Sequence, residues 1–146
     1  MEETVGGIVE PAGLLAARQL VEWGARVFPA FVSKSGEKVP LVKGWPDAAI
    51  GKREVENGTG GETLREWYAR YPYAWAGIAC GPDSFLCLDA DRESGVGRLR
   101  EFVRSVGGWE SGAMVARTPG RDTGGIHIYW RWPSWLDGSF HSAKVR

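Results

Sequence analysis

The chain has 146 residues, of which 43% are hydrophobic and 25% charged, a composition typical of a soluble globular protein and unlike that of a disordered chain. This length suits one compact domain over residues 1–146, and the apolar stretches are far shorter than the roughly 20 residues of a membrane-spanning helix. The 18 basic residues balance 18 acidic ones, which excludes a strongly basic domain and leaves only local patches for binding nucleic acid.

The first part of the chain predicts a helix, a strand and a long loop. Apolar residues at three- and four-residue spacing after Pro11 indicate a helix that ends at Gly24. A strand over residues 25–32 should follow. Residues 33–61 are rich in Gly, Lys and Pro, so we expect a long ordered loop with one helical turn.

The rest of the chain alternates between helical and strand patterns. The elements predicted there are a helix over 64–71, strands over 75–79 and 85–89, a helix over 96–106, and strands over 113–118 and 126–132. Thr63 and Glu66 match the capping box of the first helix, and the turn sequence 81–84 predicts that the strands on either side of it pair with each other. The order of elements predicts an α+β or α/β sandwich, in which helices flank a mixed sheet.

Asp89 and Asp91 are the first candidate site residues. Alternate residues of a strand share a face, so the two carboxylates should converge, with roughly 6 to 7 Å between their Cα atoms. They follow the apolar run 85–88, which indicates a central strand. Paired carboxylates suit Mg²⁺ or Mn²⁺ and phosphoryl transfer. On spacing alone, a polar turn after a strand is the more common explanation.

His127 is the second candidate. Alternation places it on one strand face with Tyr129 and Arg131, and a guanidinium can bind phosphate through two hydrogen bonds. Gly124 and Gly125 precede it, and their flexible backbone could approach a phosphate closely. A hydrogen-bonded structural histidine after a hairpin turn is the alternative.

Cysteine usage and the N-terminal residues favour a cytoplasmic protein. Cys80 and Cys87 are expected to be buried free thiols, and together with His127 and His141 they lack the close pairs of a zinc site. The N-terminus has no secretory signal pattern.

Basic patches for nucleic acid would have to come from three groups of residues: Lys34, Lys38 and Lys43; Lys52 with Arg53; and Arg117, Arg121 and Arg131.

An ordered series of motifs covers most of the chain. These motifs are Gly24-Ala-Arg-Val-Phe28-Pro29, Lys38-Val-Pro40, Gly44-Trp45, Trp67, Pro72, Gly77-Ile-Ala-Cys-Gly81, Leu88-Asp-Ala-Asp91, Gly95, Arg117-Thr118 and Gly124-Gly-Ile-His127-Ile-Tyr129-Trp130. In this order they resemble the N-terminal domain of the bifunctional DNA primase/polymerases, the prim-pol branch of the archaeo-eukaryotic primase superfamily. The order is much more specific than any single motif.

The resemblance implies roles for the candidate residues. It implies that Asp89 and Asp91 bind the catalytic Mg²⁺ or Mn²⁺ and that His127 contacts the phosphates of the incoming nucleotide. It also implies a third metal-binding carboxylate after the histidine motif. Asp137 follows His127 too closely for that role, so we expect the chain to end before the third acidic motif.

Three functions remain open at this point. The first is metal-dependent, template-directed nucleotidyl transfer from nucleoside triphosphates, on a DNA template and primer, in replication of a plasmid, phage or other mobile element of a prokaryote. A helicase domain or protein would be its partner. The second is a catalytically incomplete fold that binds nucleotide, single-stranded DNA or a partner protein. The third is a metal-dependent nuclease with His127 as the base.

Overall fold

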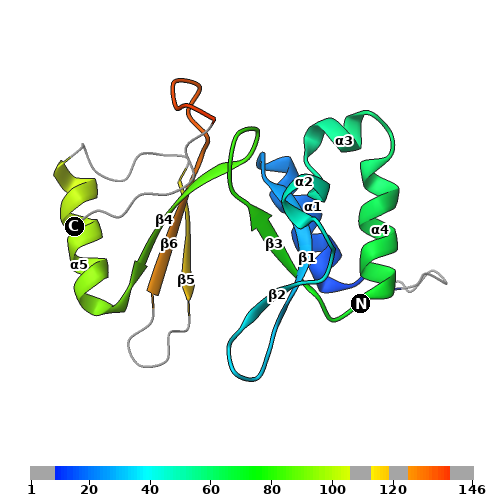
Figure 1. The fold of residues 1–146 in the computed structure, drawn as a ribbon, viewed down its shortest axis with the longest axis horizontal. Coiled ribbons are helices and arrows are strands. Elements are labelled where there is room, and N and C mark those ends of the chain that lie inside the picture. The colour runs from blue at the N-terminus through cyan, green and yellow to red at the C-terminus, as the bar shows by residue number, and fades with distance from the viewer. Residues whose placement is uncertain (1–8, 106–112, 119–124, 139–146) are drawn as a thin grey trace, which may run out of the picture. The chain divides into compact units, whose positions relative to one another are not determined.

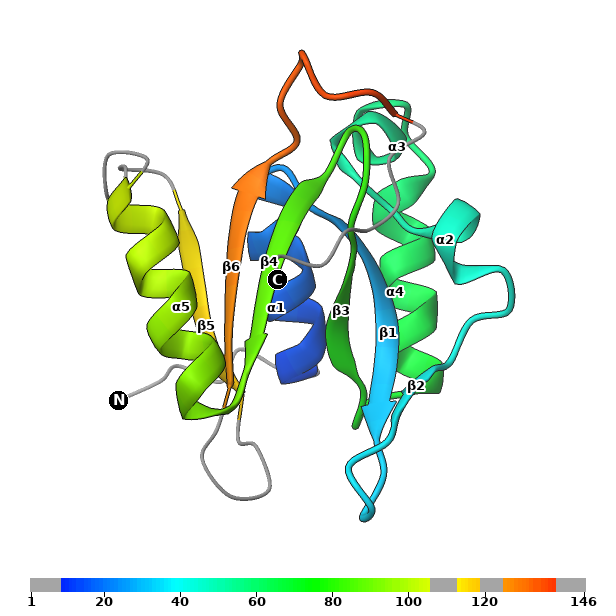
Figure 2. The ribbon, with the colours of Figure 1, turned by 60° about the vertical axis from the view of Figure 1, so that its left-hand side comes forward.

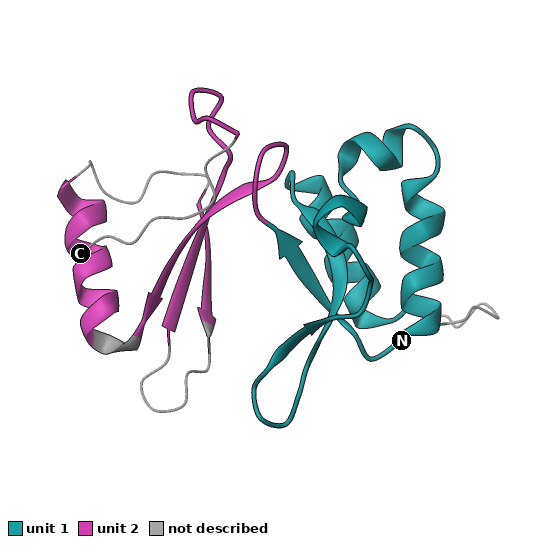
Figure 3. Ribbon diagram, in the orientation of Figure 1, with its two compact units in different colours: residues 1–79 teal, residues 80–146 magenta. Residues whose placement is uncertain are grey.

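A computed structural model describes residues 9–105, 113–118 and 125–138. The chain forms two compact units, one over residues 1–79 and one over residues 80–146 (Figure 3). The prediction of a single domain over residues 1–146 stays a prediction, and each unit is described by itself.

The first unit contains a three-stranded antiparallel sheet with the strand order β2-β1-β3 (Figure 1). Its elements are α1 (Ala12–Glu22), β1 (Arg26–Val32), β2 (Lys38–Pro40), α2 (Trp45–Ala48), α3 (Lys52–Glu56), α4 (Gly60–Arg70) and β3 (Trp75–Ala79). In α1 the buried residues are Leu14, Ala17 and Val21, as the apolar spacing predicts. Gly24 follows the end of α1 with a φ of 104°, a backbone conformation that favours glycine over other residues.

The core of the first unit includes one close approach between β1 and β3. Phe28 lies directly opposite Gly77, and its ring stacks at 4.5 Å between centroids on Trp45 of α2. The neighbouring strand must therefore leave room for the ring, which glycine does. From α4, the buried Tyr68 donates a hydrogen bond of 3.2 Å to the carbonyl oxygen of Trp75, at the start of β3.

The second unit contains a three-stranded antiparallel sheet with the order β4-β6-β5. Its elements are β4 (Phe85–Asp91), α5 (Arg92–Ser105), β5 (Met114–Thr118) and β6 (Gly125–Arg131). Helix α5 lies along the sheet (Figure 2), and its Val103 is buried with Ile126 and Ile128 of β6. This confirms that the predicted helix covers the sheet, although α5 begins before Val96.

The α+β class is confirmed, but several local predictions are wrong. Residues 33–61 contain β2, α2 and α3 instead of a loop with one turn. Helix α4 begins at Gly60, so Thr63 lies inside the helix, where its hydroxyl donates to the carbonyl oxygen of Thr59 instead of capping. The start of α4 lies so close to α3 that a Cβ on Gly60 would be 2.7 Å from the carbonyl carbon of Glu54.

The third wrong prediction concerns strand pairing. The strands on either side of the turn 81–84 do not pair with each other: β3 pairs with β1, and β4 pairs with β6. Apolar side chains alternate along β4, and β6 offers a matching apolar face. Pairing of the two strands puts Leu88 and Ala90 beside Ile126 and Ile128 in one apolar cluster. Strand β6, not β4, is the middle strand of the described sheet.

Candidate functional site

The β4–β6 sheet has one apolar face and one polar face. Leu88 of β4 and Ile128 of β6 lie in the cluster that includes Val103 of α5. Side chains alternate along a strand and directly opposite residues share a face, so Asp89 and His127 lie on the face away from α5. The polar side chains predicted to share a face therefore do so.

The register of the two strands determines the neighbours on this polar face. Its directly opposite pairs are Phe85 with Arg131, Cys87 with Tyr129, Asp89 with His127, and Asp91 with Gly125. From the third strand, β5, Ala116 is opposite His127 and Met114 is opposite Tyr129. The residue of β5 directly opposite His127 is thus the small Ala116.

Asp89, His127 and Tyr129 form a continuous group of polar contacts. The Nε2 atom of His127 is 3.0 Å from Oδ1 of Asp89. Its other ring nitrogen, Nδ1, is 3.0 Å from the hydroxyl of Tyr129. The Asp89 side chain is 55% exposed and the His127 side chain 16% exposed, so the group extends from the solvent into the sheet.

The other candidate residues occupy the two ends of the polar face. Asp91 is exposed and lies opposite Gly125 at the end of β4. Arg131 is also exposed and lies four residues beyond His127 on β6, about 13 Å away at the rise of an antiparallel strand. Gly124 lies outside the described residues. The acid pair, His127 and Gly125 are thus close together, and Arg131 is not beside them.

Sequence reasoning missed the contribution of two cysteines next to this group. Both are free thiols, but Cys80 is exposed and Cys87 half-buried, so the prediction that both are buried is wrong. A hydrogen bond between the two thiols lowers the pKa of Cys80 and raises the pKa of Cys87. Burial, and then the neighbouring Cys87, raise the pKa of Tyr129. Only the register places Cys87 beside Tyr129, so no local signal could have revealed it.

Asp89 and Asp91 offer the type of ligand atom that a hard divalent cation prefers, but two residues are too few to form a complete site. Both are exposed carboxylates on one strand face, and Mg²⁺ and Mn²⁺ prefer such oxygen ligands. Within residues 9–105, 113–118 and 125–138, no three His, Cys, Asp or Glu side chains are close enough to hold a metal ion together. Asp89 and Asp91 are therefore at most a partial ligand set among these residues.

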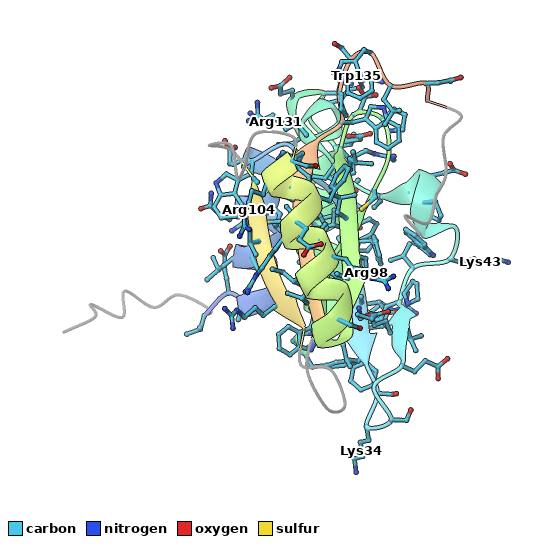
Figure 4. All side chains as sticks on the ribbon, turned by 90° about the vertical axis from the view of Figure 1, so that its left-hand side faces the viewer. Lys34, Lys43, Arg98, Arg104, Arg131 and Trp135 are labelled. Atoms are coloured by element: carbon cyan, nitrogen blue, oxygen red, sulfur yellow. The ribbon has the colours of Figure 1, made fainter. Side chains whose placement is uncertain are left out.

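Basic side chains are exposed on several elements. Figure 4 shows Lys34 and Lys43 in the first unit, Arg98 and Arg104 on α5, and Arg131 with Trp135 in the second unit. Of the residues predicted to form basic patches, the exposed ones are Lys34, Lys38, Lys43, Lys52, Arg53, Arg117 and Arg131. Arg121 lies outside the described residues.

One comparison with known proteins identified a relationship. Residues 17–146 match the model of the Prim-Pol family, described as "Bifunctional DNA primase/polymerase, N-terminal". The chain matched no curated protein and no solved structure. Among the described residues, no helix has both the length and the apolar composition required to span a membrane.

Proposed function

The chain belongs to the Prim-Pol family of DNA primase/polymerase domains, and from this membership we propose that the polar face of β4 and β6 is part of a metal-dependent nucleotidyl-transfer site. The observation that carries the proposal is the meeting of Asp89, Asp91 and His127 on one face of two paired strands. They are the acid pair and the histidine to which the resemblance to the family gives these roles. The substrates would be nucleoside triphosphates and a DNA template with its primer.

Each residue has a role in this proposal. Asp89 and Asp91 would hold Mg²⁺ or Mn²⁺ through their carboxylate oxygens. Such an ion would supply charge neutralisation for the triphosphate. His127 donates an N–H to a phosphate oxygen. The backbone at Gly124 and Gly125 lets a phosphate approach, and Arg131 binds a more distant phosphate group.

The setting that we propose is replication of a plasmid, phage or other mobile element of a prokaryote. The net charge of the chain is +0, so most of the affinity for DNA would come from a partner. A helicase domain or protein would supply that affinity and deliver single-stranded template.

The decisive test replaces both carboxylates by amides, in the double variant Asp89→Asn with Asp91→Asn. An amide oxygen can still accept a hydrogen bond from His127, so the local structure is preserved while the charge needed for the cation is removed. We expect template-dependent incorporation of labelled nucleotide with Mg²⁺ or Mn²⁺ to fall at least about a thousandfold in the variant, as expected when the metal site is lost.

Glu101→Gln is the matched control, since it removes an exposed carboxylate from α5, on the other side of the sheet. We expect it to retain wild-type incorporation. Incorporation that survives in the Asp89→Asn, Asp91→Asn variant would refute the proposed site.

An alternative function is nucleotide or single-stranded DNA binding without transfer. It is favoured by the absence of a third metal ligand near Asp89 and Asp91 within the described residues. Calorimetry that detects metal-dependent binding of a nucleoside triphosphate, together with no primer extension in Mg²⁺ or Mn²⁺, would support this alternative. Degradation of labelled DNA without added nucleotide would instead indicate a nuclease.

A further inference from the structure

Both ring nitrogens of His127 have a partner at hydrogen-bond distance. Nε2 is 3.0 Å from a carboxylate oxygen of Asp89, and Nδ1 is 3.0 Å from the hydroxyl of Tyr129. A carboxylate has no proton to give, so Nε2 must carry the hydrogen of the first contact. When the imidazole is neutral it has a single N–H, so Nδ1 then accepts and the tyrosine hydroxyl donates, whereas a doubly protonated ring would donate from both nitrogens.

We propose that Tyr129 is a positioning residue, which donates its O–H to Nδ1 and thereby holds His127 as the Nε2–H tautomer with that N–H directed toward Asp89. The proposal deepens the function proposed above, because Nε2–H is then the group that His127 offers to a phosphate. The proposed function above assigns no role to Tyr129.

Asp89 and Tyr129, the two partners of His127, differ in their exposure to solvent. The side chain of Asp89 is 55% exposed, so its contact with Nε2 can be exchanged for another acceptor at the edge of the site. Tyr129 is half-buried, with its ring 6.2 Å from that of the buried Phe85, so its contact with Nδ1 is less open to exchange with solvent. The imidazole can thus change its partner at Nε2 without losing its orientation.

Cys87 offers the competing arrangement. It lies directly opposite Tyr129, and its sulfur could accept the tyrosine O–H. Nδ1 would then have to donate to the tyrosine oxygen, and the contact of Nε2 with Asp89 would require a doubly protonated ring. The two arrangements differ in the number of N–H groups on His127, which can be measured. Because burial raises the pKa of Tyr129, its hydroxyl keeps its proton in either case.

Nitrogen NMR of the ¹⁵N-labelled full chain tests the proposal without any nucleotide. The spectrum is recorded about two units above the ordinary imidazole pKa of roughly 6.5. The chain has two histidines, and the His141→Gln variant assigns the remaining signals to His127. We expect a protonated Nε2 and an unprotonated Nδ1 shifted by an accepted hydrogen bond. A ring protonated at Nδ1, alone or together with Nε2, would overturn the proposal.

Two variants identify the group that donates a hydrogen bond to Nδ1 of His127. In Tyr129→Phe the Nδ1 signal should move toward the position of an acceptor without a hydrogen bond. In Cys87→Ala, which removes the competing acceptor, the Nδ1 signal should stay where it is in the wild-type protein. An unchanged Nδ1 signal in Tyr129→Phe would also overturn the proposal, and the wild-type spectrum decides the matter if the variant does not fold.

A functional measurement separates this inference from the proposed function. Tyr129→Phe should raise the KM for the nucleoside triphosphate roughly 10-fold, the lower range for loss of a group that orients a site residue, with a smaller change in kcat. Tyr73→Phe, at an exposed tyrosine of the first unit, should leave both unchanged. If no incorporation is found in the wild-type protein, the proposed function fails while the NMR result still stands. If incorporation is found and Tyr129→Phe matches the wild type, the positioning role fails alone.

Discussion

Cys80 and Cys87 illustrate how two residues of one type acquire different chemistry from their neighbours. Cys80 is exposed, and the hydrogen bond from the Cys87 thiol lowers its pKa. The same bond, together with burial, raises the pKa of Cys87. The thiolate is the reactive form of cysteine, so a lower pKa means more of it at neutral pH. Exposure and thiolate content therefore both favour reaction at Cys80.

We predict that iodoacetamide at neutral pH alkylates Cys80 at least about tenfold faster than Cys87. Peptide mass spectrometry after short exposure of the folded protein measures the two rates. In the Cys87→Ala variant, Cys80 should react more slowly, because its pKa returns toward that of an ordinary thiol. Faster labelling of Cys87, or no slowing in the variant, would contradict the proposed hydrogen bond.

Gly77 shows a steric requirement at the scale of a single residue. A Cβ at this position would lie 2.6 Å from the ring carbon Cζ of Phe28, and that ring cannot easily move because it also packs on Trp45. We predict that Gly77→Ala lowers the free energy of unfolding by about 1–3 kcal/mol through overpacking. Urea denaturation followed by circular dichroism measures the change.

The control for this prediction is Gly61→Ala in α4, where an added Cβ would meet nothing within 4 Å. Its effect should be neutral or stabilising by up to about 1 kcal/mol, because alanine favours the helix. Equal destabilisation by both variants would show that the contact with Phe28 is not the cause.

At the scale of elements, α5 depends on the sheet that it covers. Val103 is 2% exposed and packs with Ile126 and Ile128 of β6, whereas its neighbour Phe102 is 42% exposed. Isolated helices of this length are only marginally stable in water, so packing must supply most of the stability of α5. The helix in turn covers the apolar face opposite the candidate site.

We predict that Val103→Ala lowers the free energy of unfolding by about 1–3 kcal/mol, from lost burial and the cavity left behind. Phe102→Ala removes a larger side chain from the adjacent position and should cause the smaller loss, because much of that side chain stays in water in the folded protein. Chemical denaturation of both variants gives the comparison. A larger loss for Phe102→Ala would contradict the orientation of α5.

At the scale of the whole molecule, the prediction still to be tested is that the chain unfolds as a single cooperative unit. The chain forms two compact units, and a single domain over residues 1–146 predicts that they unfold together. Gly77→Ala changes one unit and Val103→Ala the other. Each should therefore lower the midpoint of the same transition.

Tryptophan fluorescence and far-ultraviolet circular dichroism can test this prediction, because tryptophans fall in both units and each unit has helical structure and a sheet of its own. Coincident curves for both probes are expected in the wild-type protein and in both variants. Two separate transitions, each sensitive to only one of the substitutions, would show that the units are independent domains.

The local elements of this protein were largely predictable from its sequence. The spacing of Leu14, Ala17 and Val21 predicted α1, and the alternation in β4 and β6 correctly predicted which side chains share a face. These patterns are local, since they follow from the repeat of a helix or a strand. The ordered motifs also sufficed to predict the family, which the family comparison confirmed.

Strand partners, register and contacts were decided only by the tertiary structure. A turn sequence could not show that β3 and β4 belong to different sheets, because the choice of partner depends on which distant strand buries the apolar face best. The same choice placed His127 opposite Asp89 and Cys87 opposite Tyr129. The sequence by itself thus determined the elements and the side chains on each face, whereas long-range pairing determined which of those side chains touch.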